Sequence, residues 1–230
     1  MKNNALYILT FAISITLLSC KKDKSFDIVN SEFKAVSITK DRALSFYGNK
    51  GSSITDSKTI QDFIKDINMF NLDTDIDSKP RGEIIKFISA DSAYFYNSEK
   101  TVYLKCAFKR DGNTIFFYET IYNYIRKDAN TEKLYNDIVK YQPKILKSLA
   151  LPTAGGLMYV ETRENTMVGS INDQELKLYR FAFKLNKVLG NSGWQNVTGL
   201  PFNQFNESFL QSLGDKDMLA IQPYTFNFKN

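Results

Sequence analysis

The sequence predicts an α+β fold, built mainly from an antiparallel β-meander sheet with two or three covering helices. Three observations lead to this prediction. Segments with alternating apolar and polar residues recur through much of the chain, short polar turns separate many of them, and a few stretches show helical spacing instead. Aromatic residues make up 14% of the 230 residues and there are only five prolines, which is typical of a chain that folds.

Two strands and a helix are expected before the meander. The strands cover Phe33 to Ile38 and Arg42 to Gly48, and a short polar turn joins them. The period then changes, because apolar residues recur every three or four positions from Ile60 to Ile67. The sequence therefore predicts a helix from about Lys58 to Met69, with polar residues before it that can cap its first turn.

The meander itself is expected from four β-rich segments separated by polar turns. These segments are Glu83 to Ser89, Ala93 to Asn97, Thr101 to Arg110 and Asn113 to Asn123. The pair Asp111-Gly112 is a strong short-range hairpin signal. In the third segment the alternation places Cys106 on the apolar face, which predicts a buried structural thiol.

A second series of elements is expected after the meander. A helix from about Thr131 to Tyr141 ends near Pro143, and Leu151 to Gly156 is the best candidate for an internal boundary. Beyond it we expect strands over Leu157 to Arg163, Met167 to Ile171 and Glu175 to Val188. A loop over 191–201 follows, with Trp194 as a core anchor. The last expected elements are a short helix over Phe202 to Leu213 and a strand over Met218 to Phe228. We favour a single α+β domain over residues 26–230, with a subdivision near 151–156 as the alternative.

The N-terminus has the pattern of a signal peptide. Lys2 precedes an uncharged apolar run from Ala5 to Ser19, which as a helix spans only about 22 Å, less than the roughly 30 Å hydrocarbon core of a bilayer. The run ends in Leu17-Leu18-Ser19-Cys20, which resembles the lipobox of bacterial lipoproteins. The resemblance implies that residues 1–19 are removed, that Cys20 is acylated, and that residues 20–25 form a lipidated tether.

The resemblance also suggests a location. In lipoproteins of this kind an Asp directly after the acylated cysteine retains the protein in the inner membrane, and here that position is Lys21. We therefore expect an outer-membrane protein that is anchored in membrane lipid through Cys20. The basic run over 21–24 favours the periplasmic face, and the cell surface is the alternative.

Composition excludes several chemistries. The chain contains no histidine, which excludes Ser-His-Asp and Cys-His catalysis in their usual forms as well as histidine-based zinc sites. With Cys20 acylated, Cys106 is the only remaining cysteine and has no partner for an intramolecular disulfide. The 30 basic and 25 acidic residues are interspersed, so we expect no nucleic-acid partner, and no cofactor motif is found.

One acidic segment resembles a calcium-binding loop in part. Asp73, Asp75 and Asp77 alternate after the predicted helix, as the ligands of an EF-hand loop do. However, Ser78 occupies the position that requires glycine, and Glu83 falls one place before the bidentate position. A solvated acidic loop is the favoured interpretation, with a calcium site as the alternative.

One strand of the meander carries a candidate binding face. Phe116, Tyr118, Tyr122 and Tyr124 share one side of it, while the opposite side is also apolar. The structural interpretation is a sheet that is packed on both faces. The functional alternative is an aromatic platform, or a half-open lipocalin-like β-barrel, that holds a hydrophobic or sugar ligand.

Two classes of function remain open from the sequence. The first is a non-catalytic binding or accessory module, with an envelope protein or glycan as its partner, and an immunity or inhibitor protein is one version of it. The second is a carboxylate-dependent hydrolase, which needs two Asp or Glu groups roughly 5–10 Å apart in a cleft. The missing histidine and the aromatic antiparallel scaffold favour the first class.

Overall fold

The computed structural model describes residues 26–65, 82–123, 129–154, 156–190 and 193–230. In chain order, the strands are β1 (Glu32–Lys40), β2 (Ser45–Tyr47), β3 (Ile84–Phe87), β4 (Ser92–Tyr96), β5 (Val102–Asp111), β6 (Thr114–Asn123), β7 (Lys144–Thr153), β8 (Gly156–Ile171), β9 (Glu175–Val188), β10 (Trp194–Phe202) and β11 (Met218–Lys229). The helices are α2 (Ser57–Ile64) and α3 (Ala129–Ile138), with short 3₁₀ segments η1 (Asn49–Gly51) and η3 (Glu207–Ser212).

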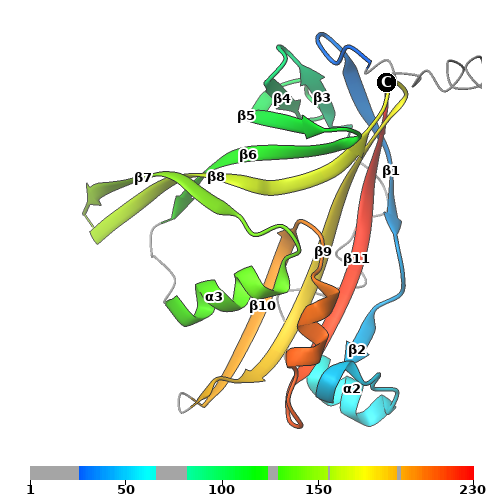
Figure 1. The fold of residues 1–230 in the computed structure, drawn as a ribbon, viewed down its shortest axis with the longest axis vertical. Coiled ribbons are helices and arrows are strands. Elements are labelled where there is room, and N and C mark those ends of the chain that lie inside the picture. The colour runs from blue at the N-terminus through cyan, green and yellow to red at the C-terminus, as the bar shows by residue number, and fades with distance from the viewer. Residues whose placement is uncertain (1–25, 66–81, 124–128, 155, 191–192) are drawn as a thin grey trace, which may run out of the picture.

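Eight of the strands close into an antiparallel barrel (Figure 1). Around the barrel the order is β9, β11, β1, β3, β4, β5, β6 and β8. The pairing of Val168–Ile171 in β8 with Leu176–Tyr179 in β9 completes the ring. The expectation of a mainly antiparallel protein is therefore confirmed, and the closed barrel fits the barrel alternative. A meander sheet with covering helices is not confirmed.

The barrel interior is filled largely by phenylalanine side chains. Phe87 and Phe108 meet edge to face with ring centroids 4.9 Å apart, and Phe95 and Phe117 do so at 5.4 Å. Cys106 lies in this core, as its alternation predicts, and burial together with the charge of Glu119 raises the pKa of its thiol to about 12. The thiol is thus an apolar core group at neutral pH.

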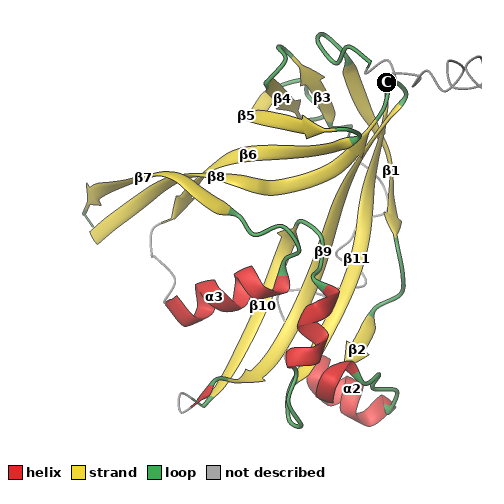
Figure 2. Ribbon diagram, in the orientation of Figure 1, coloured by secondary structure: helices red, strands yellow, loops and turns green. Residues whose placement is uncertain are grey.

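A second packed layer lies below the barrel, where β9 and β11 continue beyond the ring (Figure 2). Phe181 and Phe183 of β9 pack with α3 and η3, whereas the alternate residue Ala182 packs with Phe63 of α2. The strand β10 extends this region by pairing with the later half of β9. The helices therefore cover the two faces of the β9–β11 extension rather than the barrel. Neither described α-helix has the length or the apolar content to cross a bilayer.

Several sequence-based boundaries are wrong. Residues 194–202 form β10, although a loop was expected there, and Trp194 is 53% exposed instead of anchoring the core. β7 was not expected, and β8 is one continuous strand where two were predicted. The expected helix over Phe202 to Leu213 is reduced to η3. The reason is tertiary pairing, because long partner strands support segments whose own sequence contains glycine, proline and polar residues.

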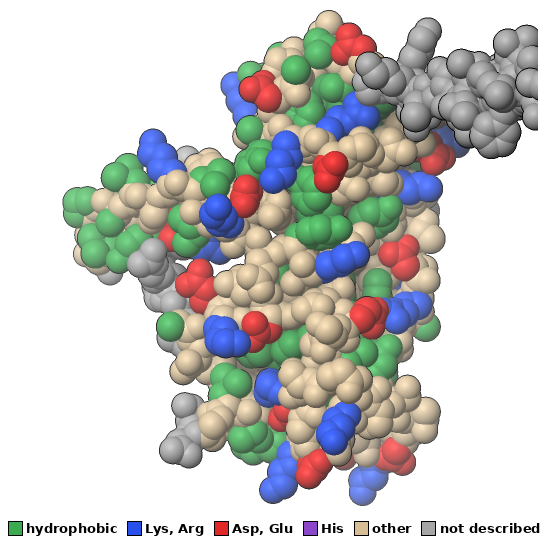
Figure 3. Space-filling view, viewed as in Figure 1, with side chains coloured by type: hydrophobic (Ala, Val, Ile, Leu, Met, Phe, Trp, Pro, Cys, Tyr) green, Lys and Arg blue, Asp and Glu red, His purple; other side chains and the backbone are tan. Residues whose placement is uncertain are grey.

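The β7–β8 hairpin projects from the barrel as an arm, and the candidate boundary Leu151 to Gly156 falls at the turn of this hairpin (Figure 1). Apolar side chains are exposed along the arm, among them Leu146, Leu149 and Leu157. Figure 3 shows this apolar arm beside a body on which basic and acidic side chains are interspersed. The charge pattern of this face thus agrees with the absence of a basic stripe in the sequence.

Candidate ligand-binding cavity

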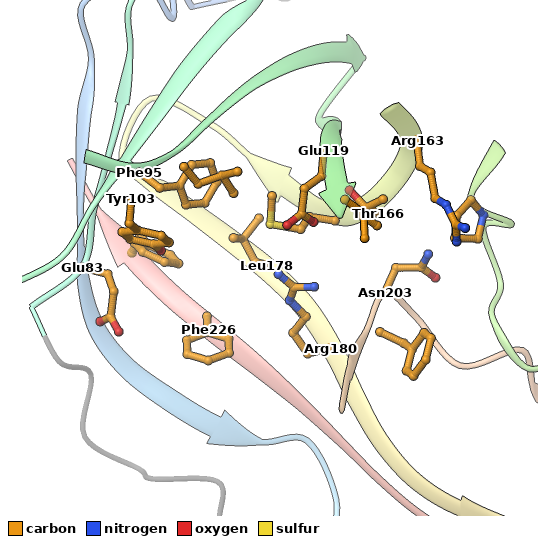
Figure 4. Close-up of a pocket in the computed structure, with 16 residues that line it drawn as sticks. Glu83, Phe95, Tyr103, Glu119, Arg163, Thr166, Leu178, Arg180, Asn203 and Phe226 are labelled. Carbon is orange, nitrogen blue, oxygen red and sulfur yellow. The ribbon is translucent and has the colours of Figure 1, made fainter. Parts of the chain in front are cut away.

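A cavity of about 400 Å³ lies at the end of the barrel that faces the second layer (Figure 4). Side chains from β4, β5, β6, β8, β9 and β11 form its walls, and Phe202 and Asn203 approach from the end of β10. The cavity exists because β9 and β11 continue past the ring while the barrel strands β4 and β5 stop, so one end of the interior is not covered by a strand. Cavities of this size are within the range that holds small organic ligands.

The inner part of the cavity is apolar. Met167, Leu178 and Phe228 are buried core residues of the barrel that also contact the cavity. Phe95 is buried beside them, and Tyr103, which is 56% exposed, meets it edge to face with ring centroids 6.3 Å apart. This part of the wall favours an apolar ligand surface, because water next to these groups gains little hydrogen bonding.

Two charged side chains interrupt the apolar rows where they reach the cavity. On β6, the buried Phe117 is followed on the same face by Glu119, and on β9 the buried Leu178 is followed on the same face by Arg180. Figure 4 shows Glu119 and Arg180 pointing into the cavity from different strands. The sheet alternation therefore places one acidic and one basic group at the outer part of an otherwise apolar site.

An irregularity in β8 completes the wall next to Glu119. The β6–β8 register pairs Phe117 with Met167 but Glu119 with Arg163, so β8 contains extra residues at this point. Asn165, within this bulge, has a φ of 58°. The hydroxyl of Thr166, at this bulge, donates to the carbonyl oxygen of Phe117 at 3.4 Å, and it also acts to lower the pKa of Glu119.

Arg180 has no fixed partner. Its side chain is half-buried, and within the described ranges no hydrogen bond or ion pair to its guanidinium is found. Burial lowers the pKa of Arg180, whereas Tyr224, Glu119 and Tyr103 act in the opposite direction. A guanidinium stays charged throughout the physiological range, so the cavity holds a positive charge whose hydrogen-bond donors are not used.

The carboxyl group of Glu119 has a raised pKa. Burial raises the pKa of this carboxyl group above its usual value, although the charge of Arg180 and the hydrogen bond from Thr166 partly offset the effect. The carboxyl group therefore favours its neutral form more than an exposed glutamate does. Its negative charge, where present, compensates Arg180 only from a distance, since the two side chains form no ion pair within 4.0 Å.

The other arginine of the cavity, Arg163, has an acidic partner. Arg163 donates to Glu161 through Nε at 2.9 Å and through Nη2. Glu161 is buried, and its second oxygen accepts a bond of 3.4 Å from the Ser148 hydroxyl. Of the two arginines that line the cavity, Arg163 therefore has an acidic partner, whereas Arg180 has no hydrogen-bond or ion-pair partner within the described residues.

The candidate sites from the sequence are placed as follows. Phe116 and Tyr118 lie on the outer face of β6, where Lys109 Nζ lies 5.5 and 6.0 Å from the two ring centroids, and Phe116 also packs against Tyr141. Tyr122 belongs to β6, while Tyr124 lies outside the described residues. The cavity uses the opposite face of this strand, so ligand binding by the aromatic face stays a prediction.

The other two predicted sites cannot be placed. Cys20 and the aspartates Asp73, Asp75 and Asp77 lie outside the described residues. Within the described part of the chain, no group of three or more Cys, Asp or Glu side chains is arranged to hold a metal ion. The acylated cysteine and the calcium loop therefore remain predictions from the sequence.

Sequence reasoning missed Arg180 and Glu119. The signal that could have found them is a charged residue at the end of an inward-facing apolar row, as in Phe117-Tyr118-Glu119 and Leu178-Tyr179-Arg180.

No protein-family model, curated protein or solved structure matches this chain. Function therefore has to be argued from the cavity itself.

Proposed function

We propose that this protein is a lipid-anchored, non-catalytic binding module of the bacterial envelope, whose barrel holds a small, largely apolar ligand. The observation that carries the proposal is the cavity of about 400 Å³ at the open end of the barrel, with apolar walls and few polar groups. Ligand sites commonly combine such walls with a small number of polar groups that fix the orientation of the ligand.

The anchor part of the proposal rests on the lipobox and on where the fold begins. Phe26, the first described residue, already packs against Phe33 of β1 with ring centroids 6.5 Å apart, and the Arg110 guanidinium lies 4.9 Å from the Phe26 ring centroid. Packing against the fold is thus present at Phe26, the residue that follows the proposed tether of residues 20–25. The proposed location, the outer membrane with the barrel facing the periplasm, rests on Lys21 and the basic run that follows Cys20 in the sequence.

A carboxylate-dependent hydrolase is the second candidate, because Glu119 has the raised pKa of a general acid and Glu83 lines the same cavity. However, the charge that acts on the pKa of Glu119 is that of Arg180, and Glu83 is not among the causes of the shift. Figure 4 places Glu83 and Glu119 at different sides of the cavity. The arrangement lacks the coupled carboxylate pair of a glycosidase, which favours binding over turnover.

The cavity can be tested with an uncharged probe. We expect the full chain in lipid nanodiscs to bind octan-1-ol, measured by isothermal titration calorimetry after subtraction of the heat from empty discs. Ile121→Trp, at the half-buried outer wall of the cavity, should reduce binding at least tenfold because the indole fills the site. Leu146→Trp, at an exposed position on the β7–β8 arm, is the matched control and should bind as the wild type does.

Equal binding by the wild type and Ile121→Trp would place the probe elsewhere and contradict the proposed site. The hydrolase alternative makes a different prediction. Turnover of p-nitrophenyl glycosides that Glu119→Gln abolishes, with the fold unchanged by circular dichroism, would favour the enzyme.

A further inference from the structure

The cavity contains one guanidinium, that of Arg180, which forms no hydrogen bond or ion pair among the described residues, while the carboxyl groups of Glu119 and Glu83 also line the wall. Burial raises the pKa of Glu119, and the charge of Arg180 partly offsets this effect. Arg180, in contrast, keeps all its donors unused within the described residues, next to the apolar side chains of Leu178 and Phe226. A guanidinium next to apolar groups loses part of its hydration, and this cost is recovered only when an anion accepts its hydrogen bonds.

We propose that the ligand of this cavity is an amphipathic acid, with a carboxylate that binds Arg180 and an apolar body that fills the inner cavity. This inference rests on the proposed function, because it assigns the ligand class of the same site. The guanidinium presents two parallel N–H groups, which match the two oxygens of a carboxylate. One arginine supplies one positive charge, which suits a monoanion.

The walls determine where the rest of such a ligand lies. Leu178 and Phe95, buried core residues of the barrel, form the inner end, while Arg180 and Glu119 lie toward the outer part of the site (Figure 4). A carboxylate at Arg180 therefore directs an alkyl or aryl chain inward, onto the apolar core of the barrel. The reverse orientation would bury the carboxylate among phenylalanines with no donor, which is costly.

The charge of Glu119 should weaken the binding of an acid. An ionised Glu119 attracts Arg180 and repels an incoming carboxylate, so it competes with the ligand for the same guanidinium. Removing its charge should strengthen the binding of an acid. A residue with a purely structural role at this position has no reason to produce a gain in affinity.

The experiment compares two probes of equal chain length, octanoate and octan-1-ol, by titration calorimetry at pH 7 on the full chain in nanodiscs. Because a hydrogen-bonded ion pair is stronger than a neutral contact, we expect the acid to bind about 10- to 100-fold more tightly than the alcohol. Arg180→Gln should remove this preference, so that octanoate binds no more tightly than octan-1-ol does. Arg180→Lys should keep part of it, and Glu119→Gln should strengthen octanoate binding severalfold.

Lys177→Gln is the matched control for charge. It lies on the same strand, removes the same positive charge, and breaks only an exposed ion pair with Glu175 of 3.3 Å. Its binding of both probes should equal that of the wild type. Circular dichroism melting of each variant separates a loss of binding from a loss of fold.

The outcomes distinguish the inference from the proposed function. If octanoate and octan-1-ol bind equally, or if the alcohol binds more tightly, the acid inference is wrong while the apolar cavity stands. If Arg180→Gln folds and retains the preference for the acid, the assignment to Arg180 is wrong. If the wild type binds neither probe, the proposed function fails and the inference fails with it.

Discussion

Asp217 holds together three segments that meet at the lower end of the molecule. Its buried carboxylate accepts hydrogen bonds from the backbone N–H of Gly214 at 2.8 Å and of Val188 at 2.9 Å, and from Lys187 Nζ at 2.9 Å. Burial alone would raise the pKa of Asp217, but these three partners lower it below its usual value of 3.8. A carboxylate with a lowered pKa stabilises the fold fully above that usual value, and the contribution is lost as the pH falls through the lowered value.

We therefore expect Asp217→Asn to lower the free energy of unfolding at pH 7 by about 1–3 kcal/mol, because the amide cannot accept all three hydrogen bonds. The difference from the wild type should shrink in acid, where the wild-type carboxyl group also becomes protonated. Urea unfolding at pH 7 and at pH 3 measures both effects. Asp215→Asn, at an exposed position two residues earlier, is the control, and a loss of equal size in that variant would contradict the role of Asp217.

At the scale of elements, Gly169 determines whether the barrel can close. It pairs with Leu178 in the short β8–β9 ladder, and a Cβ atom at this position would lie 2.1 Å from the carbonyl oxygen of Lys177. That oxygen belongs to the backbone of β9, so it can move only if the two strands separate. The close approach of the strands thus requires a glycine.

Gly169→Ala should destabilise the protein by about 1–3 kcal/mol or more, because the clash separates β8 from β9. Hydrogen exchange should show the earliest loss of protection at the amides of 168–171 and 176–179, before those of β4 and β5. Gly214→Ala is a suitable control, since the nearest atom to its Cβ, Asp217 Oδ2, lies at an ordinary 3.5 Å. Unchanged exchange in the β8–β9 ladder of the Gly169 variant would show that the strands tolerate the methyl group.

The same elements show which parts of the fold can be predicted from the sequence. The strands β3 to β6 can, because each hairpin has a local signal, such as Asp111-Gly112 with Gly112 at a φ of 56°. β10 cannot, because its sequence mixes polar residues with a glycine and a proline, and its strand form depends on pairing with β9. Closure also depends on non-local contacts, so a sheet and a barrel were equally compatible with the local pattern.

The candidate site follows the same division. The alternation of β6 and β9 could show that Glu119 and Arg180 share a face with apolar core residues. It could not show that these two faces meet at one cavity, since this depends on the β8 bulge and on the continuation of β9 beyond the ring. The outer aromatic face is more conspicuous in the sequence than the inner face, which drew attention to Phe116 and Tyr118.

At the scale of the whole molecule, the proposed lipid anchor has a direct test. Cys20→Ser should abolish the incorporation of labelled palmitate and block cleavage before residue 20, because the peptidase of this pathway requires the lipid-modified cysteine. The wild type should partition with the outer membrane after detergent extraction. Cys106→Ser is the matched control and should retain the label, since that thiol is buried in the barrel. Wild-type protein that takes up no palmitate and is recovered free in the periplasm would contradict the anchor.

The pairing of β1 with β11 sets the order in which this protein can assemble. Lys34 lies opposite Lys229 and Lys40 opposite Tyr224, so the first strand of the barrel is completed only by the last one along the chain. If the chain is exported from its N-terminus, as proposed, β1 keeps one unpaired edge until β11 has also been exported. Contacts of such large sequence separation fold slowly. We therefore expect the barrel to close late in folding, after its local hairpins have formed.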